Sequence, residues 1–195
     1  MERIRLEIKR QPIHILLGLL LVALIYYDSL NPKVLLTVII IAIFSSLIIK
    51  KYKPRPVYKL LEFIERSDAL EAFPGKGLIA YLIGALIVFL LFEKEIAMAA
   101  IMILALGDSF SRLIGPFGKI KHPFNNTKFL EGLIAGLIAA SLGAMLFIRP
   151  HEAVAASFIA MLLEGVDLKL FKLKIDDNIT IPVVAGAIIW LIRIL

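Results

Sequence analysis

The sequence predicts an all-α integral membrane protein, a polytopic helical bundle with about seven spans. Two observations predict this fold class. Of the 195 residues, 60% are hydrophobic, with a mean hydropathy of +0.91, and the apolar residues are gathered in long blocks. Backbone groups in lipid must form their hydrogen bonds within the segment, so each block is expected to be a helix. We expect a single membrane domain over residues 1–195.

Polar or turn-forming residues separate the apolar blocks. The fourth block rises only about 18 Å at 1.5 Å per residue, against a hydrocarbon core of about 30 Å. Either its helix continues past Asp108 or the membrane is thinner there. In chain order, the predicted spans are 13–28, 33–49, 77–92, 96–107, 129–148, 152–165 and 179–195.

The distribution of lysine and arginine predicts the orientation. If the N-terminus is cytoplasmic and the spans alternate, eighteen of the 22 basic residues lie on the inner side. The longer polar loops, 108–128 and 166–178, then face the cytoplasm, where nucleotides are found. The apolar residues of 57–72 share one helical face, which predicts an amphipathic helix on the inner membrane surface. A plain connector is the alternative for this segment.

The composition also limits the partners. The net charge of +6 comes from basic residues between the spans, so we attribute it to orientation and to attraction for anionic lipid, and expect no nucleic-acid partner. The chain has no cysteine, which excludes disulfides and thiolate metal sites. The lipid bilayer is the expected partner, and a homo-oligomer is possible.

Charged residues stand where apolar helices meet the cytoplasmic loops. Asp108 and Arg112 follow the fourth block at a spacing of four, and Glu164 ends the sixth. Charges this near hydrocarbon are costly and usually functional, so we expect them to line a wet cavity open to the cytoplasm and reachable from the bilayer. Asp108 and Arg112 could simply pair on one helical face. Alternatively, Asp108 binds Mg²⁺ and Arg112 binds a phosphate.

The loop and the helix start that follow contain further candidates. Gly115-Pro116-Phe117-Gly118-Lys119 is a turn, either a plain reverse turn or one that contacts phosphate, and it lacks the spacing of a Walker A loop. Lys128 stands at the start of the fifth block, where a helix N-terminus favours anions. Glu131 could interact with the helix dipole and nothing more. Small residues then recur at Gly132, Gly136, Ala140 and Gly143, which predicts close helix packing.

The last block begins with polar residues. Within 176–182, Asn178 or Thr180 is expected to cap the helix, although the two acids and the amide could equally form a second metal or ribose site. His14 lies just inside the first block, and a lone histidine there is more often a structural hydrogen-bonding group than a catalyst. The sequence has no Ser-His-Asp or HExxH arrangement.

Taken in order, these motifs resemble the CTP-dependent polyprenol kinase family. This family includes dolichol kinase, phytol kinase and the CTP-using diacylglycerol kinases, and it is related to phosphatidate cytidylyltransferase. Ser111 and Phe129 depart from the family pattern, which has alanine and serine there. The motifs that carry the resemblance are Ile8 to His14, Pro74-Gly75-Lys76-Gly77, Gly107-Asp108 with Gly115 and Gly118-Lys119, Lys128-Phe129-Leu130-Glu131-Gly132, and Glu164 followed by Asp176 to Pro182.

The resemblance implies transfer of the γ-phosphate of CTP to a membrane alcohol, most simply a polyprenol such as dolichol, on the cytoplasmic side. It implies Mg²⁺ as the cofactor. It suggests that Asp108 and Asp177 hold Mg²⁺ and that Arg112 and Lys128 bind phosphates. Gly115, Gly118 and Lys119 would form the phosphate loop, and Asp177 and Asn178 would contact the nucleotide. The catalytic base would be Glu131 or else Glu164.

Three alternatives remain open at the level of the sequence. One is a diacylglycerol or phytol-type kinase with the same chemistry. Another is a cytidylyltransferase that makes a CDP-lipid, although the chain is short for that group. The third is a small transporter or channel, which the gathering of charges on one side of the membrane disfavours, since an ion path needs polar groups across the bilayer.

Overall fold

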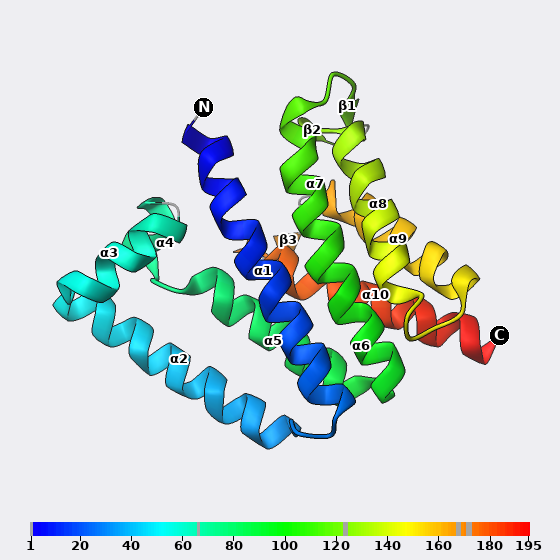
Figure 1. Cartoon of the computed structure of the whole chain (residues 1–195), viewed down its shortest axis with the longest axis horizontal. Helices are drawn as coiled ribbons and strands as arrows, with labels where there is room; N and C mark the ends of the chain where they lie inside the picture. Colours follow the sequence, from blue (N-terminus) through cyan, green and yellow to red (C-terminus); the bar gives the residue numbers. More distant parts are fainter. Residues whose placement is uncertain (1, 66, 123–124, 167–168, 171–172) are drawn as a thin grey trace.

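The computed structural model describes residues 2–65, 67–122, 125–166, 169–170 and 173–195. The chain is almost entirely helical, as Figure 1 shows, so the predicted all-α membrane fold is confirmed. Within the described residues, four helical stretches are long and apolar enough to cross a membrane. They are Leu6–Tyr26, Pro32–Tyr52, Lys94–Phe117 and Asp177–Ile194.

The first two helices form a hairpin at the N-terminal end of the chain. Helix α1 covers Glu2–Tyr26 and helix α2 covers Pro32–Tyr52. The start of α2 is capped because the side chain of Asn31 accepts a hydrogen bond from the Val34 backbone N–H at 3.0 Å, and Pro32 suits the first helical position. At the far end of α2, Lys53 adopts a left-handed conformation and closes the helix.

Two short helices replace the single surface helix predicted for 57–72. Helix α3 covers Arg55–Ile64 and helix α4 covers Ser67–Ala72. Two apolar side chains of α3, Val57 and Leu60, are 41% and 63% exposed, so α3 has an apolar face that the rest of the described chain does not cover. Contact of this face with the membrane surface remains a prediction.

The central helix of the bundle is built from three consecutive segments. Helix α6, Lys94–Met102, continues through a π-helical turn, Ile103–Asp108, into helix α7, Ser109–Ile114. Every residue from Ile96 to Ala105 is buried, and the surrounding helices α1, α5, α8 and α10 all pack against this stretch. Two alternatives were considered for the short fourth block, and the structure supports the one in which its helix continues past Asp108. The predicted loop 108–128 therefore begins as helix.

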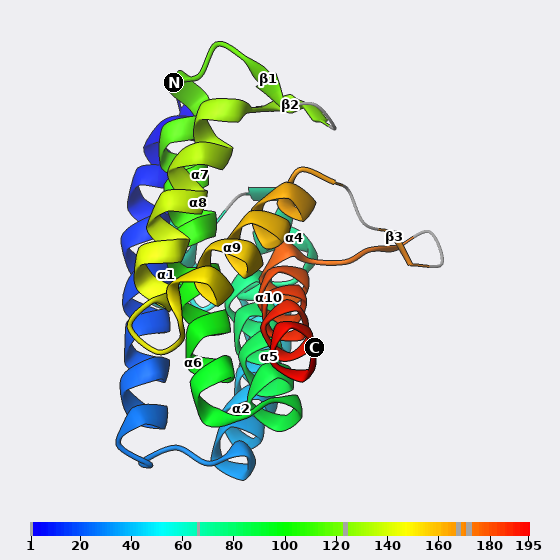
Figure 2. The ribbon, with the colours of Figure 1, turned by 90° about the vertical axis from the view of Figure 1, so that its right-hand side faces the viewer.

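The remaining elements surround this central helix. Helix α5 covers Lys76–Leu91 and follows Gly75, whose positive φ of 78° explains a glycine at that turn. Strands β1, Lys121–His122, and β2, Asn125–Phe129, form an antiparallel hairpin at the end of the bundle where the N-terminus also lies (Figure 2). The other elements are a 3₁₀ turn, Gly115–Phe117, directly after α7, then α8, Leu130–Ala144, α9, Pro150–Glu164, β3, Lys169–Leu170, β4, Leu173–Lys174, and α10, Asp177–Ile194.

The number of spans remains a prediction. Three of the seven predicted spans correspond to α5, α8 and α9, which have 16, 15 and 15 residues. At 1.5 Å per residue such helices are about 22 to 24 Å long, which is less than the hydrocarbon thickness. Length and apolarity therefore identify four candidate spans in the described chain, with these shorter helices packed among them.

The small-residue stripe of α8 lies against the central helix, which confirms the predicted close packing. A Cβ atom added at Gly136 would stand 2.7 Å from the Gly107 carbonyl oxygen. One added at Gly132 would stand 2.8 Å from Gly115 Cα and 2.8 Å from the Ser111 carbonyl oxygen. Because these neighbours are backbone atoms, only glycine permits the approach.

We predict that Gly136→Val destabilises the protein in detergent by about 1–3 kcal/mol, because the larger side chain would push α8 away from the central helix. The measurement is thermal unfolding followed by circular dichroism. Gly77→Ala is the matched control, since a Cβ at Gly77 would approach only the Arg10 side chain, at 3.8 Å. Equal unfolding temperatures for the two variants would contradict the packing described here.

Candidate functional site

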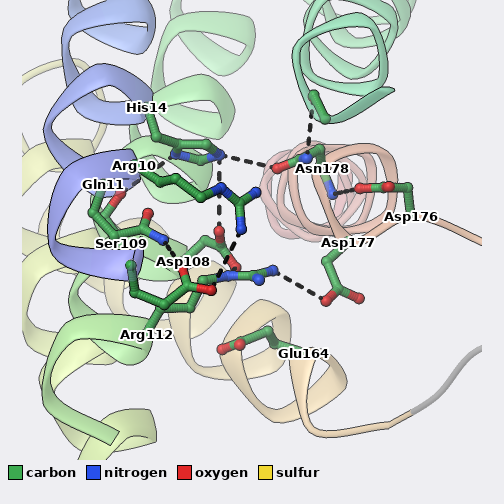
Figure 3. Close-up of polar contacts among 12 residues, drawn as sticks. Arg10, Gln11, His14, Asp108, Ser109, Arg112, Glu164, Asp176, Asp177 and Asn178 are labelled. Carbon is green, nitrogen blue, oxygen red and sulfur yellow. Dashed lines mark hydrogen bonds and ion pairs between the residues drawn. The ribbon is translucent and has the colours of Figure 1, made fainter. Parts of the chain in front are cut away.

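Charged and polar side chains that are largely buried gather at one end of the bundle. Figure 3 shows them pointing toward one another from α1, the central helix, α9 and α10. Asp108 is 2% exposed and Glu164 is 5% exposed. Groups of this kind are rarely buried unless they are paired or functional, so the partners of each one identify what the site can do.

Arg112 connects two acidic residues from different helices. Its Nε donates to Asp108 Oδ1 at 2.7 Å, and its Nη2 lies 3.4 Å from Asp177 Oδ2. The first contact is the pairing at a spacing of four that the sequence suggested, and the second joins the central helix to the start of α10. The structure thus brings together three predicted site residues that come from two distant parts of the sequence, namely Asp108, Arg112 and Asp177.

Lys128 forms a further ion pair of the site, with Glu164. Its Nζ lies 2.7 Å from Glu164 Oε1 and also donates to the backbone carbonyl of Glu164. Lys128 stands in β2, two residues before α8 begins, so its ammonium ties the hairpin to the end of α9. The sequence named both residues as site candidates, but nothing in the spacing of 36 positions indicated that they pair.

His14 is positioned by hydrogen bonds to residues of two other helices. The Asn178 side-chain amide donates to the Gly77 carbonyl at 3.3 Å, which turns Asn178 Oδ1 toward His14 Nε2 at 2.9 Å. His14 Nε2 must then be the donor, and Nδ1 can accept from the Ser109 hydroxyl at 3.3 Å. His14 therefore links α1, α7 and α10, and its Nε2 lies 3.8 Å from Asp108 Oδ2.

The cap of α10 differs from the one predicted. Asp176, rather than Asn178 or Thr180, is the capping residue, because its Oδ1 accepts from the Asn178 backbone N–H at 3.1 Å. This assignment follows from the extended backbone of Asp176, which places its carboxylate over the first helical turn. The side chains of Asp177 and Asn178 are consequently directed to Arg112 and His14.

Glu131 has a different environment from the other candidates. Its Oε1 accepts from the backbone N–H groups of Lys119 at 2.7 Å and Ile120 at 3.2 Å. A Cβ atom at Gly118 would stand 2.5 Å from Glu131 Oε2, so the loop passes directly over this carboxylate. The backbone donors that a phosphate would use in the Gly118–Lys119 turn are therefore engaged by Glu131.

Two cavities lie beside the charged cluster. The first, of about 360 Å³, is bounded by α1, α5, α10 and the α3–α4 region, and the second, of about 460 Å³, is bounded by the β1–β2 hairpin, α7 and α9. Arg112 and Asp177 line both. Among the predicted residues, His14, Asp108 and Asn178 line the first cavity, Gly115, Lys128 and Glu164 line the second, and Gly118, Lys119 and Glu131 line neither.

Several residues of the site had not been singled out from the sequence. Ser109 contacts His14, and His122 lines the second cavity with Thr127. Ser109 and Thr127 gave only a weak signal in the sequence, because serine and threonine are common in loops and near helix ends. Tyr81 packs edge-on against the His14 ring at a centroid distance of 4.6 Å, and only the packing of α5 near α1 reveals that contact.

A second group of charges stands at the opposite end of the central helix, where α6 begins. Glu152 is 3% exposed and accepts from Arg193 Nε at 3.1 Å and from the Arg149 backbone N–H at 3.1 Å. Arg193 also lies 3.4 Å from Glu93. These groups satisfy one another and cap α9, so we assign them a structural role at that end of the bundle.

The fold and the buried cluster define an integral membrane protein with a polar site at one end of its helical bundle. Across 94% of its length the chain is 32% identical to the uncharacterized protein MJ1137 of Methanocaldococcus jannaschii, and the match covers 92% of that protein. The chain belongs to the same family as MJ1137. No known family profile and no solved structure matches it.

Two further relatives have a described activity. The chain is 24% identical over 60% of its length to CTP-dependent diacylglycerol kinase 1 of Eremothecium gossypii. It is 28% identical over 60% of its length to the protein of the same name from Schizosaccharomyces pombe. The matched regions cover 44% and 60% of those two kinases, so the similarity spans less than two thirds of each.

We predict that acid weakens the fold through His122. Burial, reinforced by the charge of Lys128, lowers the pKa of His122 below its ordinary value of 6.5. The unfolded chain therefore takes up a proton first, so the stabilisation is present above about pH 6.5 and is lost as the pH falls toward the folded pKa. Thermal unfolding of the wild type and His122→Gln at about pH 7.5 and pH 5.5 measures this effect.

His122→Gln should narrow the difference in unfolding temperature between the two pH values, because glutamine does not titrate. Lys128→Met should also narrow it, since one cause of the lowered pKa is removed. An unchanged pH dependence in His122→Gln would show that other groups control the acid sensitivity.

Proposed function

We propose that this chain is a CTP-dependent lipid kinase that transfers the γ-phosphate of CTP to the hydroxyl group of a membrane alcohol. The observation that carries the proposal is the Asp108–Arg112–Asp177 cluster, which stands between two cavities at the end of a membrane bundle. The similarity to two CTP-dependent diacylglycerol kinases supports the same chemistry, as do the ordered sequence motifs.

The reaction forms a bond between the lipid hydroxyl oxygen and the γ-phosphorus and breaks the bond from that phosphorus to the bridging oxygen, so that CDP leaves. The hydroxyl proton passes to a base or to water. Such transfer depends mainly on positioning and on neutralisation of the phosphate charge. Arg112 suits this role, because it lines both cavities. Its contact with Asp177, at 3.4 Å, is the longer of its two ion pairs.

The residues present fit a magnesium ion. Mg²⁺ is usually held by one or two carboxylates together with substrate phosphates, and Asp108 and Asp177 contact the same guanidinium. Among the described residues, no group of three or more histidines or acids is close enough to hold a metal, so nucleotide oxygens would complete the ion's shell. When bound, the ion would neutralise phosphate charge, and Asp108 and Asp177 would hold it.

The second cavity is the proposed nucleotide site. Lys128 and Arg112 supply positive charge there, and Asn125, Thr127 and His122 supply hydrogen-bonding groups. Glu164 lines this cavity, whereas the Glu131 carboxylate is bonded to loop N–H groups. Glu131 is therefore better suited to shaping the loop. Glu164 pairs with Lys128 on the nucleotide side, so it could act as the base only for a hydroxyl group that reaches Arg112 and Asp177, the residues common to both cavities.

The acceptor is proposed as a membrane alcohol. The resemblance in the sequence points to a polyprenol such as dolichol, and the two named relatives act on diacylglycerol. Both compounds present a hydroxyl group at the membrane surface with a tail in the hydrocarbon. The excess of basic residues on the predicted inner segments supports an active site that faces the cytoplasm.

We predict that Asp108→Asn lowers phosphate transfer by about 100-fold or more, because it removes a charge at the reacting centre. The assay uses purified protein in detergent with Mg²⁺ and mixed lipid alcohols. Asp28→Asn is the matched control, since Asp28 is exposed and pairs with Lys94 at the opposite end of α1. Near-normal turnover of a folded Asp108→Asn protein would remove Asp108 from the mechanism.

We predict that CTP labelled at the γ-phosphate, and not CTP labelled at the α-phosphate, transfers its label to lipid. Label from the α-phosphate would instead identify a CDP-lipid synthase. Absence of both labels, in a protein that is folded and supplied with each class of alcohol, would leave a transporter or an enzyme that uses a different nucleotide. The labelled lipid is separated by thin-layer chromatography, which also identifies the alcohol that accepted the phosphate.

A further inference from the structure

We propose that the first cavity is the acceptor chamber, which takes the hydroxyl end of the lipid alcohol from the bilayer through a mouth between α1 and α5. This inference rests on the proposed kinase function and adds the location of its second substrate. It separates the two substrates, with the nucleotide on the hairpin side of Arg112 and the lipid on the α5 side.

One side of the cavity rim is apolar. Ile13 and Leu17 come from α1 and Leu78 comes from α5, with the buried Tyr81 deeper in the wall and the exposed Lys76 elsewhere on the rim. Ile13 and Leu78 are 48% and 47% exposed while lining the cavity, so the opening lies between apolar side chains on the outer surface of the bundle. A mouth bordered by hydrocarbon suits a ligand that arrives from lipid and not from water.

The inner end of the same cavity is polar. His14, Asp108 and Asn178 meet there (Figure 3). Asp108 Oδ1 is bonded to Arg112, and Asp108 Oδ2 lies on the side of His14, at 3.8 Å from its Nε2. A hydroxyl group can both donate and accept, so a lipid alcohol can form hydrogen bonds at this end while its chain remains among the apolar walls.

The two cavities share the residues next to which the transferred phosphoryl group would move. Arg112 and Asp177 are common to both linings. A γ-phosphate held by Arg112 on the nucleotide side would therefore lie next to a hydroxyl in the acceptor chamber, the proximity that transfer requires. Arg10 and Lys76 also line the chamber, and their charges would stabilise the phosphate that the lipid gains.

The chamber volume limits how much of the lipid it holds. About 360 Å³ is the size of a small ligand pocket, so the hydroxyl end enters and the long chains stay in the bilayer. Polyprenols and diacylglycerols share this chemistry, namely a hydroxyl group attached to a long apolar body. A probe of each kind distinguishes the two sources of the hydroxyl.

The test is photo-crosslinking with a lipid alcohol that carries a diazirine close to its hydroxyl group. Purified full-length protein in lipid–detergent micelles is irradiated with a polyprenol probe or a diacylglycerol probe, and labelled peptides are identified by mass spectrometry. We expect saturable labelling of α1 and α5 around Ile13 and Leu78 by at least one probe, displaced by the matching unlabelled alcohol.

Leu78→Trp should block the mouth. Labelling of α1 and α5 should fall, and the lipid KM should rise about tenfold, while the KM for CTP stays within about twofold. Leu90→Trp is the matched control, because Leu90 lies on the same helix, is 62% exposed and lines neither cavity. Ile13→Trp obstructs the mouth from α1 and provides a second variant if Leu78→Trp does not fold.

Two results would contradict the proposal that the first cavity is the acceptor chamber. One is saturable labelling elsewhere or none with either probe, and the other is unchanged labelling and unchanged lipid KM in folded Leu78→Trp and Ile13→Trp proteins. Labelling is measured without CTP, so it reports lipid binding whether or not the protein turns over. If the wild-type protein is labelled at α1 and α5 but transfers no γ-phosphate, the result would support the proposed lipid-binding chamber and contradict the proposed kinase function.

Discussion

The charge of Asp108 is the constraint on which the arrangement of this end of the molecule depends. Its carboxylate is almost fully buried in a bundle of apolar helices, where an isolated charge would be very unfavourable. Arg112, one helical turn later, provides the opposite charge and extends to Asp177. The start of α10 is thereby held against the central helix, and the two cavities are separated by this ion pair.

Close packing behind the cluster allows these charges to meet. The glycines of α8 bring its backbone onto the central helix at Gly107 and onto the turn after it at Gly115, which positions the hairpin and Lys128 near the end of α9. The π-helical turn that ends at Asp108 adds to this effect, because a wider turn changes which face the following residues occupy. Several glycines of the family-like motif therefore serve helix contact in addition to, or instead of, phosphate binding.

The candidate site could be predicted in part. The pairing of Asp108 with Arg112 follows from a spacing of four on one helix, which local geometry determines. The pairing of Lys128 with Glu164 joins residues 36 positions apart, so no local rule identifies it. For Glu131, the sequence suggested a role that its environment does not favour. Its position in the motif suggested catalysis, but its carboxylate accepts hydrogen bonds from the N–H groups of a neighbouring loop.

The sequence by itself determined the membrane class, the helical blocks and the residues able to bear charge at their ends, because hydropathy and backbone hydrogen bonding act over short segments. The tertiary structure decided which of those charges share a cavity, which helix supplies each wall, and where His14 finds its partners. These features depend on how whole helices pack. Their packing is set by side-chain volumes and ion pairs between segments that are distant in the chain.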